Sequence, residues 1–162
     1  MADQKLGRVW DIVEHVGVCM LTTHFAGGLR SRPLEVRPDC EQGVIQFVVD
    51  VRAGKDDEIE AAPEVCLTFI HNKEKAYLSV TGRAEVLEDE ATARAIWEKT
   101  DDAWWSGPDD PNVRVLRVEP QTAELWDGPA RAEVARYEFA KAFATGEKPN
   151  LGENRKVIVA MK

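Results

Sequence analysis

Short strand-like segments follow one another along this chain, mostly without helices between them, and this order constrains the fold more than any other feature. Apolar runs at Val18–Thr23, Val44–Asp50 and Val65–His71 have the length and composition of strands. Turn-forming residues such as Phe25–Gly28 and Pro38–Gly43 separate them. Because strands and helices do not alternate, a doubly wound α/β sheet is excluded. The order predicts a mainly β protein, with six or seven antiparallel strands in a small barrel and peripheral helices.

Helical spacing and capping residues predict four helices, at Asp3–His15, Asp56–Ala62, Asp89–Lys99 and Ala132–Thr145. Late strands are predicted at Val113–Val118 and Gln121–Trp126, divided by Glu119–Pro120. Pro33 lies inside a predicted strand, Leu29–Arg37, and since proline cannot donate to a strand ladder it indicates an edge or a bulge. With 162 residues we expect one domain over residues 1–162, with a helical and loop extension from about residue 131 to 162.

Charge and composition exclude several classes of protein. The net charge of −8 argues against nucleic-acid binding, which depends largely on neutralising phosphates. No apolar run approaches the roughly 20 residues of a membrane span, so we expect no membrane partner. The N-terminus has no cationic segment followed by an apolar core, and the chain has three widely spaced cysteines. These observations predict a reduced protein of the cytoplasm.

Positive charge gathers in two neighbouring segments of this otherwise acidic chain. Arg30, Arg32 and Arg37 lie in or beside one predicted strand, and Arg52 and Lys55 follow the next one. Arginine offers a planar fork of donors and lysine a compact point charge, which together suit a phosphate. Any one of the five could be a solvated strand end. As a set they predict an anion site.

Familiar catalytic and metal-binding patterns are absent from the sequence. His15, His24 and His71 are not spaced as metal ligands, and no Gly-x-Ser-x-Gly nucleophile motif occurs. We therefore predict no metal site and can assign no catalytic residue. The pair Trp104–Trp105 lies in a loop of Asp, Gly and Pro. It either packs the loop onto the barrel or places a ring at a planar ligand or a subunit boundary.

Five motifs in order carry a resemblance to a known family. They are Arg30-Ser-Arg-Pro-Leu34, Gln46-Phe-Val-Val-Asp50 with Lys55, Tyr77-Leu-Ser-Val-Thr-Gly-Arg-Ala84, Trp104-Trp-Ser-Gly-Pro108 and Ala123-Glu-Leu-Trp-Asp127. From about Asp3 to Lys156 the chain resembles the general stress proteins of the pyridoxamine 5′-phosphate oxidase-like group, which have the FMN-binding split β-barrel.

The resemblance implies a homodimer with FMN at the subunit interface and a flavin-dependent oxidoreductase acting on an unknown small molecule. Lys55 would meet the phosphate with Arg30 or Arg32, and Trp105 (or Trp104) would come from the opposite subunit. Strand segments along the flavin would be Arg32, Pro33 and Leu34 on one strand and Val48, Val49 and Asp50 on the next, the latter through backbone groups. Tyr77 falls where the oxidases have a polar residue near the ring.

Departures from the family pattern leave alternatives open. Val49 and Ala53-Gly54-Lys55 stand where the oxidases have a threonine and Ser-Arg-Lys around the phosphate. Each lost charge-assisted hydrogen bond costs on the order of 1.5–3 kcal/mol, which Arg52 could offset in part. The arginine-rich C-terminal segment of the true oxidases is also missing, so we do not expect oxidation of pyridoxamine phosphate. The alternative is a non-catalytic flavin-binding, storage or sensing module, or one that has lost flavin; haem or a deazaflavin is left open by the fold.

Overall fold

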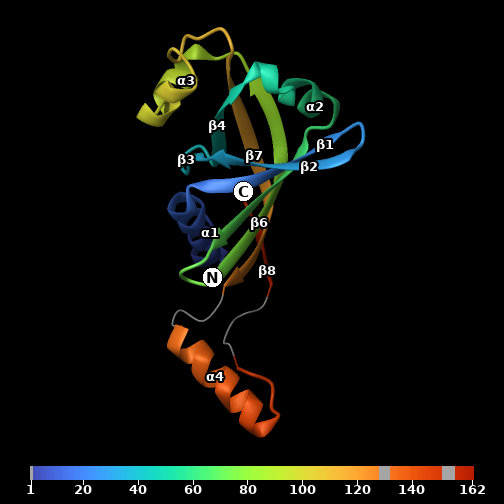
Figure 1. The fold of residues 1–162 in the computed structure, drawn as a ribbon, viewed down its shortest axis with the longest axis vertical. Coiled ribbons are helices and arrows are strands. Elements are labelled where there is room, and N and C mark those ends of the chain that lie inside the picture. Colours follow the sequence, from blue (N-terminus) through green and yellow to red (C-terminus); the bar gives the residue numbers. More distant parts are fainter. Residues whose placement is uncertain (1, 128–131, 151–155) are drawn as a thin grey trace.

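A computed structural model describes residues 2–127, 132–150 and 156–162 of the chain (Figure 1). Its elements are α1 (Ala2–Val16), β1 (Val18–Phe25), β2 (Gly28–Glu35), β3 (Arg37–Asp39), β4 (Val44–Asp50), the 3₁₀ turn η1 (Val51–Ala53), α2 (Lys55–Ala61), β5 (Glu64–His71), β6 (Ala76–Leu87), α3 (Glu90–Ile96), the 3₁₀ turn η2 (Lys99–Ala103), β7 (Val113–Asp127), α4 (Ala132–Thr145) and β8 (Val157–Ala160).

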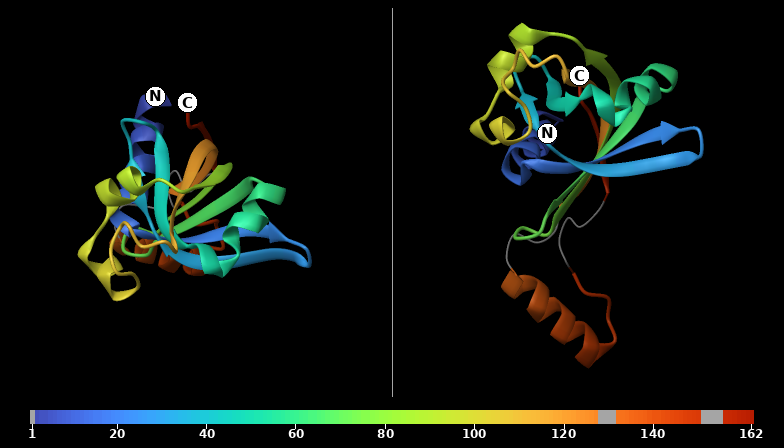
Figure 2. Two further views of the ribbon diagram at one scale, coloured as in Figure 1. Left: turned by 90° about the horizontal axis from the view of Figure 1, so that it is seen from above. Right: turned by 45° about the horizontal axis from the view of Figure 1, so that its top comes forward.

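The strands form one antiparallel sheet that curls into a barrel. Their order is β2-β1-β5-β6-β7-β4-β3, and β8 adds to β7. The two ends of this order, β2 and β3, are consecutive in the chain and separated only by Val36. One stretch of chain therefore borders both ends of the sheet, as the curled ribbon in Figures 1 and 2 shows. The mainly β barrel with peripheral helices confirms the sequence prediction.

Alternate strand residues fill the barrel. On β4 the side chains of Ile45, Phe47 and Val49 lie in the core, whereas Gln46 and Val48 point outward. Helix α1 contributes Val9, Ile12 and Val13, all fully buried, to the same core. Its apolar stripe was expected from the spacing of the sequence, and it closes one end of the barrel because the stripe faces inward.

A second, smaller apolar cluster lies outside the barrel. Helix α3 places Ala93 and Ile96 against the outward side chains of Val113 and Val115 on β7. Trp97 and Trp105 pack against the same cluster. Helix α3 and the β1–β2 hairpin project on different sides of the barrel (Figure 2).

The prediction of two strands divided by Glu119–Pro120 is wrong. β7 runs without interruption from Val113 to Asp127. The register with β6 shifts between Thr81 and Gly82, and Gly82 pairs with Pro120. This irregularity accommodates the missing N–H group of proline inside a long strand. Pro33, by contrast, lies on β2 at the end of the strand order, as the edge prediction requires.

The C-terminal extension does not stay outside the sheet. Helix α4 lies apart from the barrel in Figure 1, and Phe143 on it is 90% exposed. β8 then pairs with β7 from Thr122 to Leu125, and Val159 and Met161 join the barrel core.

Gly7 and Gly82 provide a matched test of this architecture. A Cβ atom at Gly82 would lie 2.4 Å from the carbonyl oxygen of Glu119, whereas one at Gly7 meets nothing within 4 Å. Gly82→Ala should therefore lower the free energy of unfolding by roughly 1–3 kcal/mol through overpacking. Gly7→Ala should raise it by about 0.5–1 kcal/mol, because glycine inside a helix is costly. Urea denaturation compares both variants with the parent; equal midpoints for the two would contradict the close approach at Gly82.

Candidate functional site

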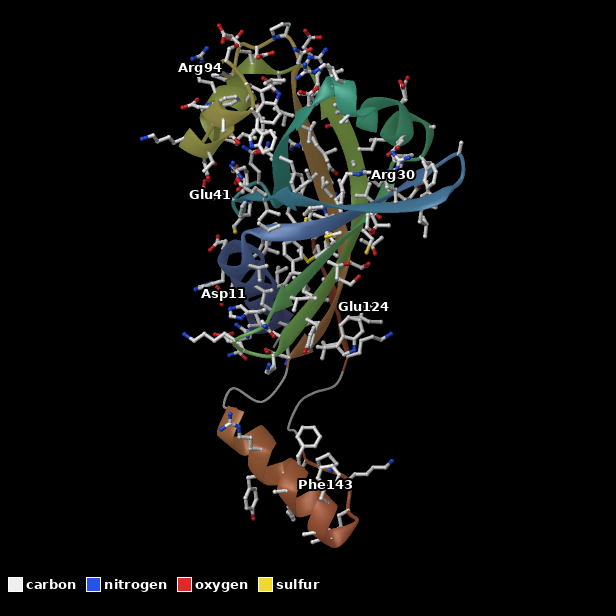
Figure 3. The ribbon with its side chains drawn as sticks, in the orientation of Figure 1. Asp11, Arg30, Glu41, Arg94, Glu124 and Phe143 are labelled. Atoms are coloured by element: carbon white, nitrogen blue, oxygen red, sulfur yellow. The ribbon has the colours of Figure 1, made fainter. Side chains whose placement is uncertain are left out.

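Two arginines of β2 converge on one carboxylate of α2. Arg30 Nη1 lies 2.9 Å from Glu58 Oε1, and Arg32 Nη2 lies 3.1 Å from Glu58 Oε2. Thr23 on β1 completes the group: its hydroxyl donates to Glu58 Oε2 at 3.0 Å and accepts from Arg32 Nη1 at 3.0 Å. Figure 3 shows Arg30 on the hairpin beside α2. We call Thr23, Arg30, Arg32 and Glu58 the arginine site.

The arginine site holds more positive than negative charge. Glu58 is the one carboxylate that pairs with both guanidinium groups among the described ion pairs. Arg32 is largely buried, while the Arg30 side chain is 50% exposed. Arg30 also lies over the ring of Phe25, 4.6 Å from its centre. The two forks are thus held in place with one net positive charge, which suits an added anion.

The barrel is split beside this site. β4 pairs with β3 only from Val44 to Gln46, so among the described strands the second half of β4 has no partner on that side. Within the part of the chain that the structure describes, β2 pairs with β1 alone. The side chain of Val49 points into the barrel core and that of Val48 onto the outer cluster. Any contact from these two residues to a ligand in the split must come through backbone groups.

Asp50, at the end of β4, binds residues from two loops. It accepts hydrogen bonds from the backbone N–H of Arg52 at 2.8 Å and from Arg52 Nε at 2.9 Å. The indole N–H of Trp105 donates to its other oxygen at 3.1 Å. The hydrogen bonds from the Arg52 side chain lower the pKa of Asp50 most, burial partly opposes them, and those from the Arg52 backbone and Trp105 add to the lowering. Arg52 is therefore engaged with Asp50 rather than with the arginine site.

The two adjacent tryptophans have different surroundings. Trp105 packs edge-on against Trp97, with ring centres 6.0 Å apart, and bonds Asp50 of its own chain. Trp104 is 76% exposed. Of the two, Trp104 is the one whose ring is available to another molecule.

Tyr77 is not brought to the arginine site within one chain. It lies at the start of β6, opposite Ile70 and Trp126, and is 42% exposed. Pro33 and Leu34 follow Arg32 along β2, as expected. Lys55 begins α2, and its side chain lies outside the described part of the structure. The ten predicted residues thus fall into a group around the split and a separate position at Tyr77.

Thr23 and Glu58 were missed from the sequence. Thr23 ends an apolar run, and Glu58 lies in the acidic run Asp56-Asp-Glu58, which reads as charge favouring a helix start. The one sequence signal for Glu58 was its position: it follows Lys55 by about one helical turn, so both residues are expected on the same face of the helix.

The described residues provide neither a metal-ligand cluster nor a membrane-spanning helix. They contain no group of three or more His, Cys, Asp or Glu side chains placed to hold a metal ion. Their helices also include none with the length and hydropathy of a membrane-spanning segment.

Comparison with known proteins decides the family. The family model described as "Pyridoxamine 5′-phosphate oxidase like" matches residues 4–150. The chain belongs to this family. General stress protein 26 of Bacillus subtilis is 28% identical over 131 residues, which cover 79% of this chain and 92% of that protein. The family resemblance inferred from the five motifs is confirmed.

Solved structures of this family share the fold. A general stress protein 26 from Jannaschia sp. CCS1 is similar over 99% of both chains, with a TM-score of 0.76 and 27% identity. A protein from Xanthomonas citri, described as a general stress FMN/FAD binding protein, has a TM-score of 0.68 and 21% identity over 77% of this chain and 89% of its own. The split β-barrel prediction is confirmed by this agreement.

Asp50 should make the free energy of unfolding of this protein depend on pH in the acid range. A carboxyl whose pKa is lower in the folded than in the unfolded chain stabilises the fold above its unfolded value, about 3.8, and this contribution is lost as pH falls below it. We expect Asp50→Asn to be less stable than the parent at pH 7 and to lose less stability between pH 5 and pH 3. Urea unfolding followed by tryptophan fluorescence measures both. Glu60→Gln, an exposed change on α2, serves as control; a parent and an Asp50→Asn variant with parallel pH profiles would contradict the assignment.

Proposed function

We propose that this protein binds FMN in the split between β2 and β4, with the phosphate at the arginine site. The observation that carries the proposal is the pair of arginines held by one carboxylate beside two open strand edges. Family membership supports it, as does the description of a structural neighbour as FMN/FAD binding.

The residues present fit a flavin phosphate. A phosphate dianion would approach the exposed side of Arg30 and bind guanidinium donors, with Lys55 as a further candidate from the start of α2. Isoalloxazine carries several acceptors and one donor along its edge, which backbone groups of Arg32, Pro33 and Leu34 on β2 and of Val48, Val49 and Asp50 on β4 can match. Val49 and exposed Ala53 offer no hydroxyl to the phosphate, so we expect fewer hydrogen bonds there than in the oxidases.

The proposed reaction class is flavin-dependent oxidation or reduction of a small molecule. Bound flavin would supply hydride or electron transfer, which needs no catalytic triad in the protein. The chain's own part is to fix the phosphate through the arginine site and to exclude water along the split. A non-catalytic flavin carrier or sensor is the second candidate, favoured by the missing hydroxyls.

The same proposal includes a homodimer. Outward side chains in the middle of the sheet form an uncharged face, bordered at one end by the Glu64–Arg83 ion pair: Val18, Met20 and Thr22 on β1, Cys66, Thr68 and Ile70 on β5, and Tyr77, Ser79 and Thr81 on β6. Ile70 is 59% exposed and Val18 46%. In a chain with 31% charged residues, such a face is suited to a second copy. Tyr77 and exposed Trp104 would then serve the neighbouring subunit's flavin.

A cytoplasmic location completes the proposal. Cys19, Cys40 and Cys66 are all free thiols, which a reducing compartment preserves.

Arg30→Ala tests the phosphate position, because Arg30 is the exposed guanidinium that the phosphate would approach. Loss of charge-assisted bonds worth about 1.5–3 kcal/mol should weaken FMN binding at least tenfold in a fluorescence titration. Riboflavin, which lacks the phosphate, should lose much less affinity, so the ratio of the two dissociation constants isolates the phosphate contact from any general damage to the fold. Arg94→Ala, which removes an exposed guanidinium on α3 outside the uncharged face, is the control. An unchanged ratio in Arg30→Ala would place the phosphate elsewhere.

Enzyme and carrier are separated by anaerobic reduction of the flavin-loaded protein with NADPH, followed by reoxidation with candidate acceptors. Turnover supports the oxidoreductase; bound flavin that is neither reduced nor reoxidised within minutes supports the carrier. If the protein neither copurifies with flavin nor gains thermal stability from added FMN, both the oxidoreductase and the carrier proposals are wrong.

The uncharged face makes a separate prediction. Ile70→Glu should convert the dimer to a monomer, because two copies of the new carboxylate would be desolvated at the interface. Sedimentation velocity measures the mass, and Ala103→Glu, exposed on η2 outside this face, should leave it unchanged. A parent protein that sediments as a monomer would refute the dimer, and a dimeric Ile70→Glu variant would refute this face as its interface.

A further inference from the structure

A cleft of about 820 Å³ lies between α3 and the outer face of β3, β4 and β7. Its lining includes Arg37, Gln46 and Arg117 from the strands and Ile96 from α3. Glu41, in the β3–β4 turn, lies at its rim, and Figure 3 shows this residue beside β3 and below α3. We call it the α3 cleft. The hairpin that carries the arginine site projects on a different side of the barrel from α3 (Figure 2).

Three long polar side chains cross the floor of the α3 cleft in a row. Arg37 on β3 pairs with Gln46 on β4, and Gln46 pairs with Arg117 on β7. Their strand neighbours Phe47, Leu116 and Val118 point into the barrel core, so the alternation of the strands turns this row outward.

The guanidinium of Arg37 is occupied by contacts within the fold. Its guanidinium is only 9% exposed and donates to Asp101 at 3.2 and 3.3 Å and to the carbonyl oxygen of Ile96 at 3.2 Å. Glu35 and Glu98 each lie 3.3 Å from it. These contacts fix α3 and η2 against β3, which makes the walls of the cleft rigid.

Gln46 and Arg117 differ from Arg37 in making no such bonds, although Glu85 on β6 stands opposite Arg117 in the strand register. Gln46 is 6% exposed, yet among the described residues its amide makes no hydrogen bond. Arg117 beside it makes neither a hydrogen bond nor an ion pair within the described part of the chain. A buried amide without partners is costly, and buried polar groups in native proteins are almost always satisfied. An amide NH₂ and a guanidinium side by side form a donor set for a carboxylate.

The remaining lining limits the ligand. Ala91, Ala95 and Ile96 give the α3 wall an apolar surface. Glu14, Asp39, Glu41 and Glu98 line the cleft as well, so its rim is acidic. This negative rim repels phosphates and other polyanions more strongly than a monocarboxylate, whose single charge Arg117 can balance.

We propose that the α3 cleft binds a small organic monocarboxylate, with its carboxylate on Arg117 and Gln46 and its apolar body against Ile96 and Ala95. The site is separate from the arginine site, and the proposal stands without a bound flavin. A volume of this size is in the range of small-molecule sites.

The test uses 3-phenylpropionate and its neutral isostere 3-phenylpropanamide, titrated calorimetrically into the full-length protein with and without saturating FMN. We expect the acid to bind at least tenfold more tightly than the amide, and Arg117→Ala to remove this preference. Arg94→Ala removes a positive charge from the exposed face of α3, where Figure 3 shows it, and should leave the preference intact. Inorganic phosphate should not compete.

Further variants keep the result interpretable if Arg117→Ala folds poorly. Gln46→Glu places a carboxylate on the floor of the cleft and should lower the affinity for 3-phenylpropionate at least tenfold. Gln46→Leu removes an unsatisfied polar group and should raise the stability of the unliganded protein or leave it unchanged. Equal binding of acid and amide, competition by phosphate, an equal effect of Arg94→Ala, or no binding up to 10 mM acid would each overturn the proposal. Because the titrations run with and without FMN, failure of the flavin proposal leaves this result readable.

Discussion

The architecture depends on one stretch of backbone serving both ends of a curled sheet. Gly28–Glu35 pairs with β1, and after Val36 the chain pairs with β4 as Arg37–Asp39. Residues that pair with β1 as part of β2 cannot also pair with β4, and the residues of β3 that pair with β4 cannot also pair with β1. The second half of β4 and the free side of β2 are therefore left as open edges, and the split between them follows from connectivity rather than from any particular side chain.

Arg37 shows how a second layer is added to this barrel. It lies directly after the change of partner at Val36 and carries α3 and η2 through Asp101 and the Ile96 carbonyl. Breaking a buried pair of this kind is costly because it leaves one charge buried without a counter-charge. The outer cluster of Val113, Val115 and Trp97 adds apolar burial to the same attachment.

Much of the fold could be predicted from the sequence, because strand runs, turns and helix caps are local signals. The β7 error shows the limit: Pro120 is a strong break signal, and it is overridden by Gly82 on another strand, which no local window contains. The site divides in the same way. Arg30 and Arg32 stand out by charge in an acidic chain, but the assignment of Glu58 to them depends on how α2 packs on the hairpin. Arg37 was grouped with Arg30 and Arg32 in the predicted anion site. In the structure it lies on the next strand, β3, and pairs with Asp101.

Glu58 has a consequence for how an anion enters the arginine site. Without it, Arg30 and Arg32 would lie close together as two bare cations, and each would have to be neutralised by ions from solution. With Glu58 bonded to both, the protein carries its own counter-ion. An arriving dianion then joins guanidinium groups that Glu58 already partly neutralises, so it displaces fewer ions from solution. The affinity of such a site should change less with ionic strength than the number of its positive charges suggests.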